Sequence, residues 1–424
     1  MSNSSEERRN VSSTGSFGQI LKTLEDRDTN VILEDPLENY MVLNMGPKHP
    51  ATHGVLRLLI KLDGETVVDC IPELGYLHRG YEKIAENCSY HEFIPHTDRL
   101  DYISPLANNV AYVLAVEKIA GVEAPPRAQY IRVIAAELAR ISSHLMAIGS
   151  MAMDVGAMTV FLWSFREREK LYDIFDLLAG VRFTTSFTRI GGVAQDITDE
   201  TIQAIKKFLD EFPKNLDEMK RMLNRNRIFL DRTVGVGVID AEAAMEIGFS
   251  GPNLRGSGVD YDLRTFSPYL VYDQLSFDVI TEKNGDSFAR YMVRMREMEE
   301  SVKLVYQAIE KLPPGSIKAD MPKQVLPQKE RVYNKMEELI HDFVIVNDGV
   351  HPAVGDSYVA TEGSKGELGF YIISNGSGQP WRLKIRSPSF CNLQALPILL
   401  KGQMISDVVA IVGSIDPIMG EADK

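Results

Sequence analysis

Cysteine is scarce in this sequence of 424 residues. The three cysteines, Cys70, Cys88 and Cys391, lie far apart and form no CxxC pair. Structural zinc sites and iron–sulfur clusters are usually held by closely spaced thiolate pairs. The chain therefore cannot hold such a cluster by itself, and we expect it to bind no metal ion.

Signatures of nucleotide and zinc-protease sites are also missing. The sequence contains no GxGxxG, no lysine-bearing phosphate loop and no HExxH motif. Gly235–Gly237 and Gly256–Gly258 are too short to serve as nucleotide fingerprints. A nucleotide cofactor is therefore expected on another chain.

The sequence has fewer basic than acidic residues, and its apolar runs are short. Lysine and arginine number 46 against 59 acidic residues, giving a net charge of -13, which argues against a nucleic-acid partner. The longest apolar runs, such as Leu396–Leu400 and Val408–Val412, fall short of the roughly 18 residues needed to span a bilayer. Arg8-Arg9 is followed by polar residues, so it does not resemble an export signal. We expect a cytoplasmic protein that reaches a membrane only through partners.

The N-terminal part divides into two segments. Residues 1–39 are rich in serine, threonine, asparagine and charge, and are predicted to be a mobile extension or to lie along a partner. Residues 40–105 are predicted to be β-rich, because Val55–Leu62 and Thr66–Ile71 flank the turn dipeptide Asp63-Gly64. The chain is thus expected to open with a small sheet.

The central part, residues 106–345, is predicted to be a helical bundle with an irregular insertion near 230–285. A long helix should begin at Pro125-Pro126, and others are predicted over Thr159–Leu178, Asp199–Leu223 with a kink at Pro213, and Asp286–Leu312. Two apolar stripes with helical spacing are expected to be core: Ile131, Ile134, Leu138, Ile141, Leu145 and Ile148; and Tyr291, Met295, Met298, Val302, Val305 and Ile309.

The C-terminal part, residues 346–424, is predicted to contain one hairpin. Leu368–Ser374 and Trp381–Ile385 flank Asn375-Gly376, after a glycine- and serine-rich connection over Gly349–Gly366. No internal repeat is evident. The prediction is an α+β fold, with a central helical bundle flanked by small antiparallel sheets.

Five short motifs together resemble the 49 kDa (D-type) subunit family of complex I, the respiratory NADH:quinone oxidoreductase. The resemblance runs from about residue 40 to the end. The motifs are Asn44–Gly54, Gly75–Gly80, Asp98–Tyr102, Arg189–Gly192 and Asp416–Glu421.

The same family is similar to the large subunits of nickel–iron hydrogenases, whose two CxxC pairs hold the metals. This chain has Asp416-Pro417-Ile418 where a hydrogenase carries a terminal Asp-Pro-Cys motif. The thiolates that nickel requires are absent. The resemblance therefore implies a hydrogenase-like fold whose metal pocket has become a pocket for an organic substrate.

Two histidines, His49 and His53, are four residues apart, a spacing that on a helix would suggest a metal pair. Pro50 and the preceding Gly-Pro instead indicate a loop, where such histidines are ordinarily satisfied turn residues. The resemblance implies a different role, in which His53 and Tyr102 face a quinone headgroup and Asp154 orients the histidine. Without it, Tyr102 would be taken for a core aromatic and Asp154 for a solvated helix cap.

The resemblance also implies a quinone-lining surface and two residues beside a partner's iron–sulfur cluster. Periodicity alone would make the stripe Met158, Phe161 and Phe165 core packing. Arg79 could equally be a surface salt-bridge residue, and Thr184 stands where many relatives carry histidine. The implied lining residues are Ser104, Met146, Ser150, Met158, Phe161 and Phe165; those beside the cluster are Arg79 and Thr184.

The expected function is that of a complex I subunit that encloses the quinone and binds no redox cofactor itself. A small subunit should hold the adjacent [4Fe-4S] cluster, and other subunits should hold NADH and FMN. Further partners would be the 30 kDa-type and other peripheral-arm subunits, and a membrane-arm subunit at the quinone entrance. Such a chain would lie on the cytoplasmic side of the bacterial inner membrane, and its substrate is expected to be menaquinone. Two alternatives stay open: a related complex fed by ferredoxin or F420, and a non-catalytic scaffold.

Overall fold

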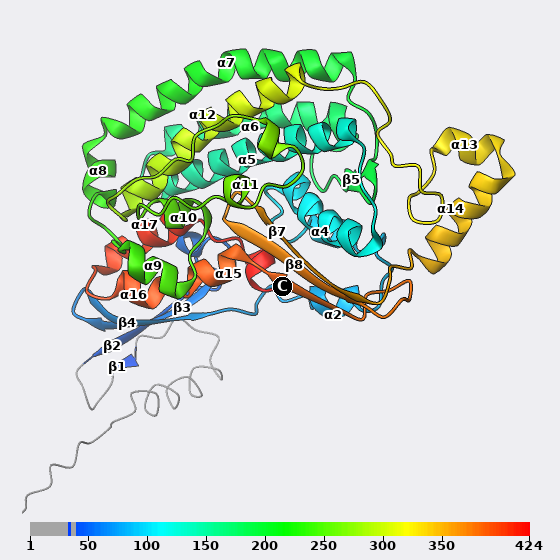
Figure 1. Cartoon of the computed structure of the whole chain (residues 1–424). Coiled ribbons are helices and arrows are strands. Elements are labelled where there is room, and N and C mark those ends of the chain that lie inside the picture. Colours follow the sequence, from blue (N-terminus) through cyan, green and yellow to red (C-terminus); the bar gives the residue numbers. More distant parts are fainter. Residues whose placement is uncertain (1–32, 35–39) are drawn as a thin grey trace, which may run out of the picture.

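The computed structural model describes residues 33–34 and 40–424, and it shows long helices packed together with three antiparallel sheets (Figure 1). The predicted α+β class is confirmed. The predicted N-terminal extension falls almost wholly outside the described residues. Its Leu33–Glu34 form β1, which pairs with β2 (Met41–Met45) at the edge of the first sheet.

The first sheet contains the predicted hairpin, β3 (Arg57–Asp63) and β4 (Thr66–Glu73). Gly64 occupies the turn with φ 59°, which glycine adopts without the steric cost of a Cβ. The sequence did not predict β2 (Met41–Met45), which pairs with β3. Two C-terminal helices, α16 (Leu396–Leu400) and α17 (Ile405–Ile415), share a hydrophobic core with this sheet.

Five long helices make up the centre of the molecule (Figure 1). Both predicted apolar stripes are buried in one core. The helix that begins after Pro125 and the one over 158–179 match their predicted positions, and the helix over 199–224 continues through Pro213. The helices are α4 (Pro105–Ala120), α5 (Pro126–Asp154), α6 (Met158–Ala179), α7 (Asp199–Asn224) and α12 (Ser287–Glu310).

Short helices occupy the region that the sequence marked as irregular. They are α8 (Arg227–Thr233), α9 (Ala241–Ile247), α10 (Gly251–Arg255), α11 (Leu263–Phe266) and η2 (Tyr272–Gln274).

This region contributes to a group of buried charged side chains that the sequence did not predict, here called the buried charge cluster. Arg255 pairs with Glu297 and Glu362, each at 2.8 Å, and Arg264 pairs with Asp262 at 2.7 Å. The cluster consists of Arg140, Arg255, Arg264, Arg294, Glu137, Asp262, Glu297 and Glu362, all buried.

The C-terminal sheet has three strands rather than the two predicted. The hairpin β8 (Glu367–Ser374) and β9 (Arg382–Arg386) is confirmed. The expectation of a plain connection over 349–366 was wrong, because β7 (Gly355–Glu362) pairs along the whole of β8. Its polar residues suggested a loop, whereas pairing with a buried neighbour gives it a place in the sheet.

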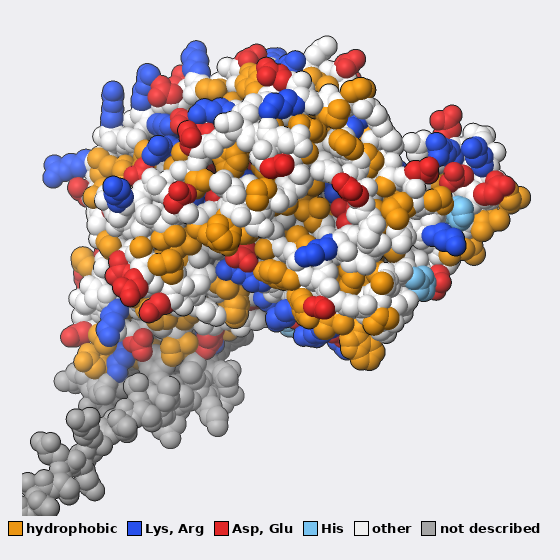
Figure 2. Space-filling view, in the orientation of Figure 1, with side chains coloured by type: hydrophobic (Ala, Val, Ile, Leu, Met, Phe, Trp, Pro, Cys, Tyr) orange, Lys and Arg blue, Asp and Glu red, His pale blue; other side chains and the backbone are white. Residues whose placement is uncertain are grey.

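Two helices, α13 (Lys329–Asn334) and α14 (Met336–Asp348), project from the body (Figure 1), and hydrophobic side chains lie along their outer edge (Figure 2). Among the described residues, no helix is long and apolar enough to cross a membrane. The remaining elements are η1 (Pro50–Thr52), α2 (Tyr81–Ala85), α3 (Ile94–Thr97), β5 (Thr188–Arg189), β6 (Gly192–Val193), α15 (Pro388–Leu393) and α18 (Met419–Ala422).

Candidate functional site

The loop that carries His53 follows strand β2 and contains a single 3-10 turn, η1. The Thr52 hydroxyl donates to the carbonyl oxygen of His49 at 2.8 Å and closes this turn. His53 has φ 49° and is followed by Gly54 with φ 112°, so the chain reverses directly after the histidine. Within the described part of the chain, no three His, Cys, Asp or Glu side chains form a group suited to hold a metal ion.

His53 is paired with Asp154, the last residue of α5. The histidine Nε2 donates to Asp154 Oδ2 at 2.7 Å, and the two side chains are 14% and 8% exposed. Asp154 is therefore not the solvated cap that its position at a helix end suggested. A carboxylate in this place fixes the ring orientation and stabilises the protonated imidazole.

Helix α17 packs against this pair through Gly413. A Cβ at this position would lie 3.2 Å from Asp154 Oδ2 and 3.4 Å from His53 Nε2. The first separation is tighter than ordinary van der Waals contact, and the second is at its lower limit. The absence of a side chain at Gly413 thus leaves room for the His53–Asp154 hydrogen bond.

Tyr102 is half-buried, and its hydroxyl has no hydrogen-bond partner among the described residues. This does not fit a core tyrosine with a satisfied hydroxyl. Burial raises the pKa of Tyr102 above its usual value, and the carboxylates of Asp101 and Asp416 raise it further. The phenol therefore keeps its proton at neutral pH and can donate it.

The C-terminal helix α18 contacts both the His53 loop and the Tyr102 loop. A Cβ on Gly54 would lie 3.3 Å from the Met419 side chain, and a Cβ on Gly420 would lie 3.2 Å from Tyr102 Cδ1. Two loops far apart in sequence thus pack against adjacent residues of one short helix. Tyr102 makes no hydrogen bond with His53 or Asp154 in the described structure.

Buried carboxylates lie close to Tyr102, and a buried lysine pairs with one of them. The Lys365 amine forms an ion pair with Asp416. Burial raises the pKa of Asp101, an effect that Lys365 opposes. Burial also raises the pKa of Glu421 to about 8, and the nearby Asp101 adds to this. The Glu421 carboxyl group, close to Asp101, can therefore be protonated at neutral pH.

Five of the six predicted lining residues lie on α5 and α6, which are in close contact. A Cβ on Gly149 would overlap Ser164 Oγ, so the two helices meet there without an intervening side chain. The rings of Phe161 and Phe165 are half-buried, with centroids 4.5 Å apart. Met158 is 55% exposed, so this stripe is not core packing.

The other predicted lining residues differ in exposure. Met146 is half-buried, and Ser150 is buried with its hydroxyl donating to the Ala147 carbonyl at 3.1 Å. Ser104 directly precedes α4 and is buried. Its hydroxyl has no partner in the described residues, which makes it available to a ligand or a water molecule.

The two residues predicted beside a partner's cluster occupy different surroundings. Arg79 is exposed, donates to the Tyr81 hydroxyl at 3.3 Å, and forms no ion pair with a described carboxylate. The alternative of a surface salt bridge is therefore not found within the described residues. Thr184 has φ 48° and Ser186 has φ 42°. Positive φ is uncommon for any residue with a Cβ and is strained for a β-branched one such as Thr184, and such strain is often found at functional sites.

The comparisons with known proteins agree with each other. Residues 154–424 match the family model of the "Respiratory-chain NADH dehydrogenase, 49 Kd subunit". The chain is 60% identical over 408 residues to D-type subunit 1 of the NADH-quinone oxidoreductase of Chloroherpeton thalassium, covering 96% of this chain and 93% of that protein. It is 53% identical over 391 residues to the D-type subunit of the Salinibacter ruber enzyme, covering 92% and 87%. It is also 53% identical over 406 residues to the D-type subunit of the Methylacidiphilum infernorum enzyme, covering 96% of each.

The chain belongs to the 49 kDa subunit family of complex I. It is therefore a subunit of NADH-quinone oxidoreductase, an enzyme of the respiratory chain, and other complex I subunits are its partners. The family resemblance seen in the five motifs is confirmed.

One residue at this site of the 49 kDa-type chain was missed from the sequence. Arg168 on α6 is buried, donates to the Met146 sulfur at 3.3 Å, and lies over the Phe165 ring at 5.0 Å from its centroid. It thus contacts two predicted lining residues. Its spacing from Phe165 places both on one face of α6, a signal that periodicity could have supplied.

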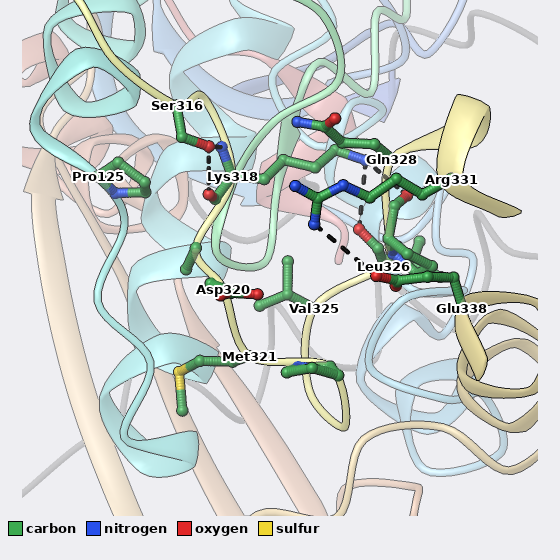
Figure 3. Close-up of a pocket in the computed structure, with 13 residues that line it drawn as sticks. Pro125, Ser316, Lys318, Asp320, Met321, Val325, Leu326, Gln328, Arg331 and Glu338 are labelled. Atoms are coloured by element: carbon green, nitrogen blue, oxygen red, sulfur yellow. Dashed lines mark hydrogen bonds and ion pairs between the residues drawn. The ribbon is translucent and has the colours of Figure 1, made fainter. Parts of the chain in front are cut away.

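The described cavities do not include the His53–Asp154 pair. One cavity of about 400 Å³ lies between Pro125 and the segments 316–331 and Glu338 (Figure 3). None of the predicted site residues lines it. A pocket formed between this 49 kDa-type chain and a neighbouring subunit would leave only one wall here, which fits the exposed Met158.

Proposed function

We propose that this chain forms one wall of the pocket in which complex I reduces quinone, with His53 and Tyr102 as hydrogen-bond donors to the headgroup. The observation that carries the proposal is the His53–Asp154 hydrogen bond of 2.7 Å next to α18, the helix against which the Tyr102 loop also packs. A tyrosine hydroxyl without a described partner and a histidine with an orienting carboxylate are thus held by one scaffold.

The chemistry of quinone reduction needs such donors. Two electrons place negative charge on both carbonyl oxygens, and two protons must follow. Donors aimed at these oxygens stabilise the charge where it develops. Tyr102 donates from its phenol and His53 from its ring, and Asp154 stabilises the imidazolium form.

Electrons reach this pocket from a [4Fe-4S] cluster on a neighbouring small subunit. This chain supplies no ligands for a cluster, because its three cysteines are separate. Arg79, exposed and unpaired within the described part, would present positive charge towards such a neighbour. NADH and FMN bind to other subunits in this proposal.

The apolar stripe Met158, Phe161 and Phe165 would contact the quinone together with Met146 and Ser150. Ser104 offers a further unpartnered hydroxyl. A membrane-arm subunit would complete the entrance, and the 30 kDa-type subunit would cover another face. The chain would thus be held at the cytoplasmic side of the bacterial inner membrane through its partners.

Substitution of the two donors tests the proposal. In assembled complex, Tyr102→Phe or His53→Ala should lower NADH:quinone turnover about 100-fold, because each removes one donor aimed at the reacting oxygens. NADH oxidation by an artificial electron acceptor should remain normal. Matched controls are Tyr333→Phe and His351→Ala, which alter exposed residues on and after the projecting α13–α14 pair. Normal quinone turnover in both test variants would rule out these roles.

Thr184 bears on the identity of the quinone. An ionisable histidine about 6 Å from a cluster, in an effective dielectric of about 20, would stabilise its reduced form by up to roughly 3 kcal/mol, or roughly 120 mV. Thr184 cannot ionise, so we propose a low and nearly pH-independent cluster potential, suited to menaquinone. Redox titration between pH 6 and 8 measures this, and a slope approaching about 59 mV per pH unit would contradict it.

A further inference from the structure

A small cavity on another part of the chain is lined by three nitrogen-bearing side chains. It has a volume of about 130 Å³, and its walls include His91, Arg189 and Lys318. His91 precedes α3, Arg189 lies in β5, and Lys318 follows α12, so three separate segments meet here. Lys318 also borders the larger cavity, where Figure 3 shows it next to Leu326.

His91 is an anomaly in this cavity. Both of its ring nitrogens are buried, and neither has a hydrogen-bond partner in the described structure. Buried polar groups are nearly always hydrogen-bonded, and an exception usually marks a missing water molecule or ion. The pKa of His91 is lowered to about 4, mainly by burial and also by the nearby Arg189 and Lys318. The neutral ring thus keeps one N–H to donate.

The two cations are also incompletely paired. Arg189 donates from Nε to the Ser186 carbonyl at 2.8 Å, and its terminal nitrogens have no partner among the described residues. Lys318 donates to the carbonyl oxygens of Leu326 and Pro327 at 3.3 and 3.2 Å. Neither cation forms an ion pair with a described carboxylate.

Two acidic residues act on these cations from a greater distance. Asp98 raises the pKa of Arg189, and Asp342 raises the pKa of Lys318, yet in both cases burial has the larger effect and lowers it. Arg189 lowers the pKa of Lys318 as well. The cavity is therefore positively charged on balance, with three donors unsatisfied or weakly satisfied.

We propose that this cavity binds a small free oxyanion, of the phosphate or carboxylate class. Such a group can accept hydrogen bonds from Lys318, Arg189 and the His91 N–H at the same time. It also offsets the positive charge of Lys318 and Arg189, which a neutral water molecule cannot do. The volume is ample, because a single water molecule needs only about 10–15 Å³ of such space. None of these residues belongs to the proposed quinone pocket, so the inference does not depend on that function.

An anion here would connect segments that already pack closely. A Cβ on Gly192 would overlap the Ile317 carbonyl oxygen, and Gly192 forms a β-bridge with Lys318. Asp98, seven residues after His91, accepts from Ser186 at 3.0 Å through the backbone N–H. A bound oxyanion that contacts Arg189 would therefore also restrain the strained Thr184–Ser186 segment, because Arg189 donates to the Ser186 carbonyl.

Phosphate binding to the purified complex tests the proposal. Equilibrium dialysis with radiolabelled inorganic phosphate, at constant ionic strength maintained with chloride, should show one saturable site per complex. Lys318→Met should weaken binding about tenfold or more, because it removes a charge-assisted hydrogen bond. The matched control is Lys323→Met, an exposed lysine on the same connection that does not line the cavity. It should leave the affinity unchanged.

Each contrary result overturns the proposal. Absence of saturable phosphate binding in the wild-type complex would mean that water or a neighbouring subunit's carboxylate fills the cavity. Equal weakening by both lysine variants would indicate general surface charge. If Lys318→Met prevents assembly, His91→Leu replaces it, with an expected weakening of about two- to tenfold for one neutral hydrogen bond. Acetate competing with phosphate would extend the site to carboxylates, and failure to compete would confine it to phosphate.

Discussion

Helix α5 contributes one residue to each of two histidine–carboxylate pairs, which have similar geometry and very different surroundings. At its C-terminal end, Asp154 accepts from His53 at 2.7 Å. In its middle, His144 donates to Glu297 at 2.9 Å. The first pair is partly exposed, with side chains 14% and 8% accessible, whereas the second is sealed at 0% and 3%.

The surroundings decide what each pair can do. Burial lowers the pKa of His144 to about 4, against a hydrogen bond with Glu297 that raises it, so this histidine is neutral at pH 7. Glu297 belongs to the buried charge cluster and also pairs with Arg255 at 2.8 Å. The His53 side chain is instead 14% exposed. The sealed pair is thus expected to be structural, whereas the partly exposed pair is the one that we propose for proton transfer.

Removal of Glu297 should have the largest effect. The cluster contains four arginines and four carboxylates, so Glu297→Ala leaves one buried positive charge without compensation. Breaking a buried pair in this way costs about 3–5 kcal/mol. Assembled complex should be nearly absent on native gels. The control Glu299→Ala removes a partly exposed carboxylate that pairs with Lys220 outside the cluster, and it should assemble normally. Normal assembly of Glu297→Ala would refute a structural role for the cluster.

The stability of the complex in acid should show whether His144 is neutral in the folded chain. The folded pKa of His144 is about 4 and its ordinary value is 6.5, so the unfolded chain binds more protons between these values. Stability is therefore lost as pH falls from 6.5 to 4, by up to about 3 kcal/mol. The thermal midpoint of wild-type complex should fall more steeply over this range than that of His144→Gln. Parallel curves would contradict the assignment of a neutral His144.

Substitution in the partly exposed His53–Asp154 pair should change activity rather than stability. Asp154→Asn keeps the shape but removes the charge that stabilises a protonated His53. A hydrogen bond to a charged group contributes about 1.5–3 kcal/mol, so quinone turnover should fall roughly 10- to 100-fold with assembly unchanged. Assays of membranes with NADH and either quinone or an artificial acceptor measure this. A loss of assembly like that of Glu297→Ala would show that both pairs are structural.

Much of the fold was predictable because it rests on local periodicity. The stripe Ile131–Ile148 repeats with helical spacing and is buried as expected. The strand β7 was missed because its stability comes from pairing with β8, and its own residues Gly355, Asp356 and Ser357 are typical of loops. The buried charge cluster was missed for a similar reason: charged residues on a helix are ordinarily exposed, and only tertiary pairing makes their burial possible.

The candidate site was predictable only through the family resemblance. His53 and Asp154 are 101 residues apart, and no spacing rule connects a loop histidine to a helix-end aspartate at that separation. Periodicity alone assigned Met158 to the core, yet it is 55% exposed, because periodicity shows which residues share a helix face and not what packs against that face. The unpartnered His91 gave no sequence signal either, since a buried histidine looks like any other.

Substitution of Gly413 should have the smallest and most specific effect on the His53–Asp154 pair. Alanine is preferred over glycine inside a helix by about 1 kcal/mol, so Gly413→Ala should stabilise α17 slightly. Its methyl group would nevertheless lie 3.2 Å from Asp154 Oδ2 and 3.4 Å from His53 Nε2, and the pair must shift by a few tenths of an ångström. Because misplacement by 1 Å can cost about 100-fold, this shift should lower quinone turnover about two- to fivefold.

A graded series makes the Gly413 prediction decisive. Gly413→Ser and Gly413→Val place larger groups at the same point, so turnover should fall in the order Ala, Ser, Val while artificial-acceptor activity stays constant. A purely structural glycine would lower assembly and leave the quinone turnover of the assembled complex unaltered. Equal turnover across all three variants would show that α17 does not position the pair.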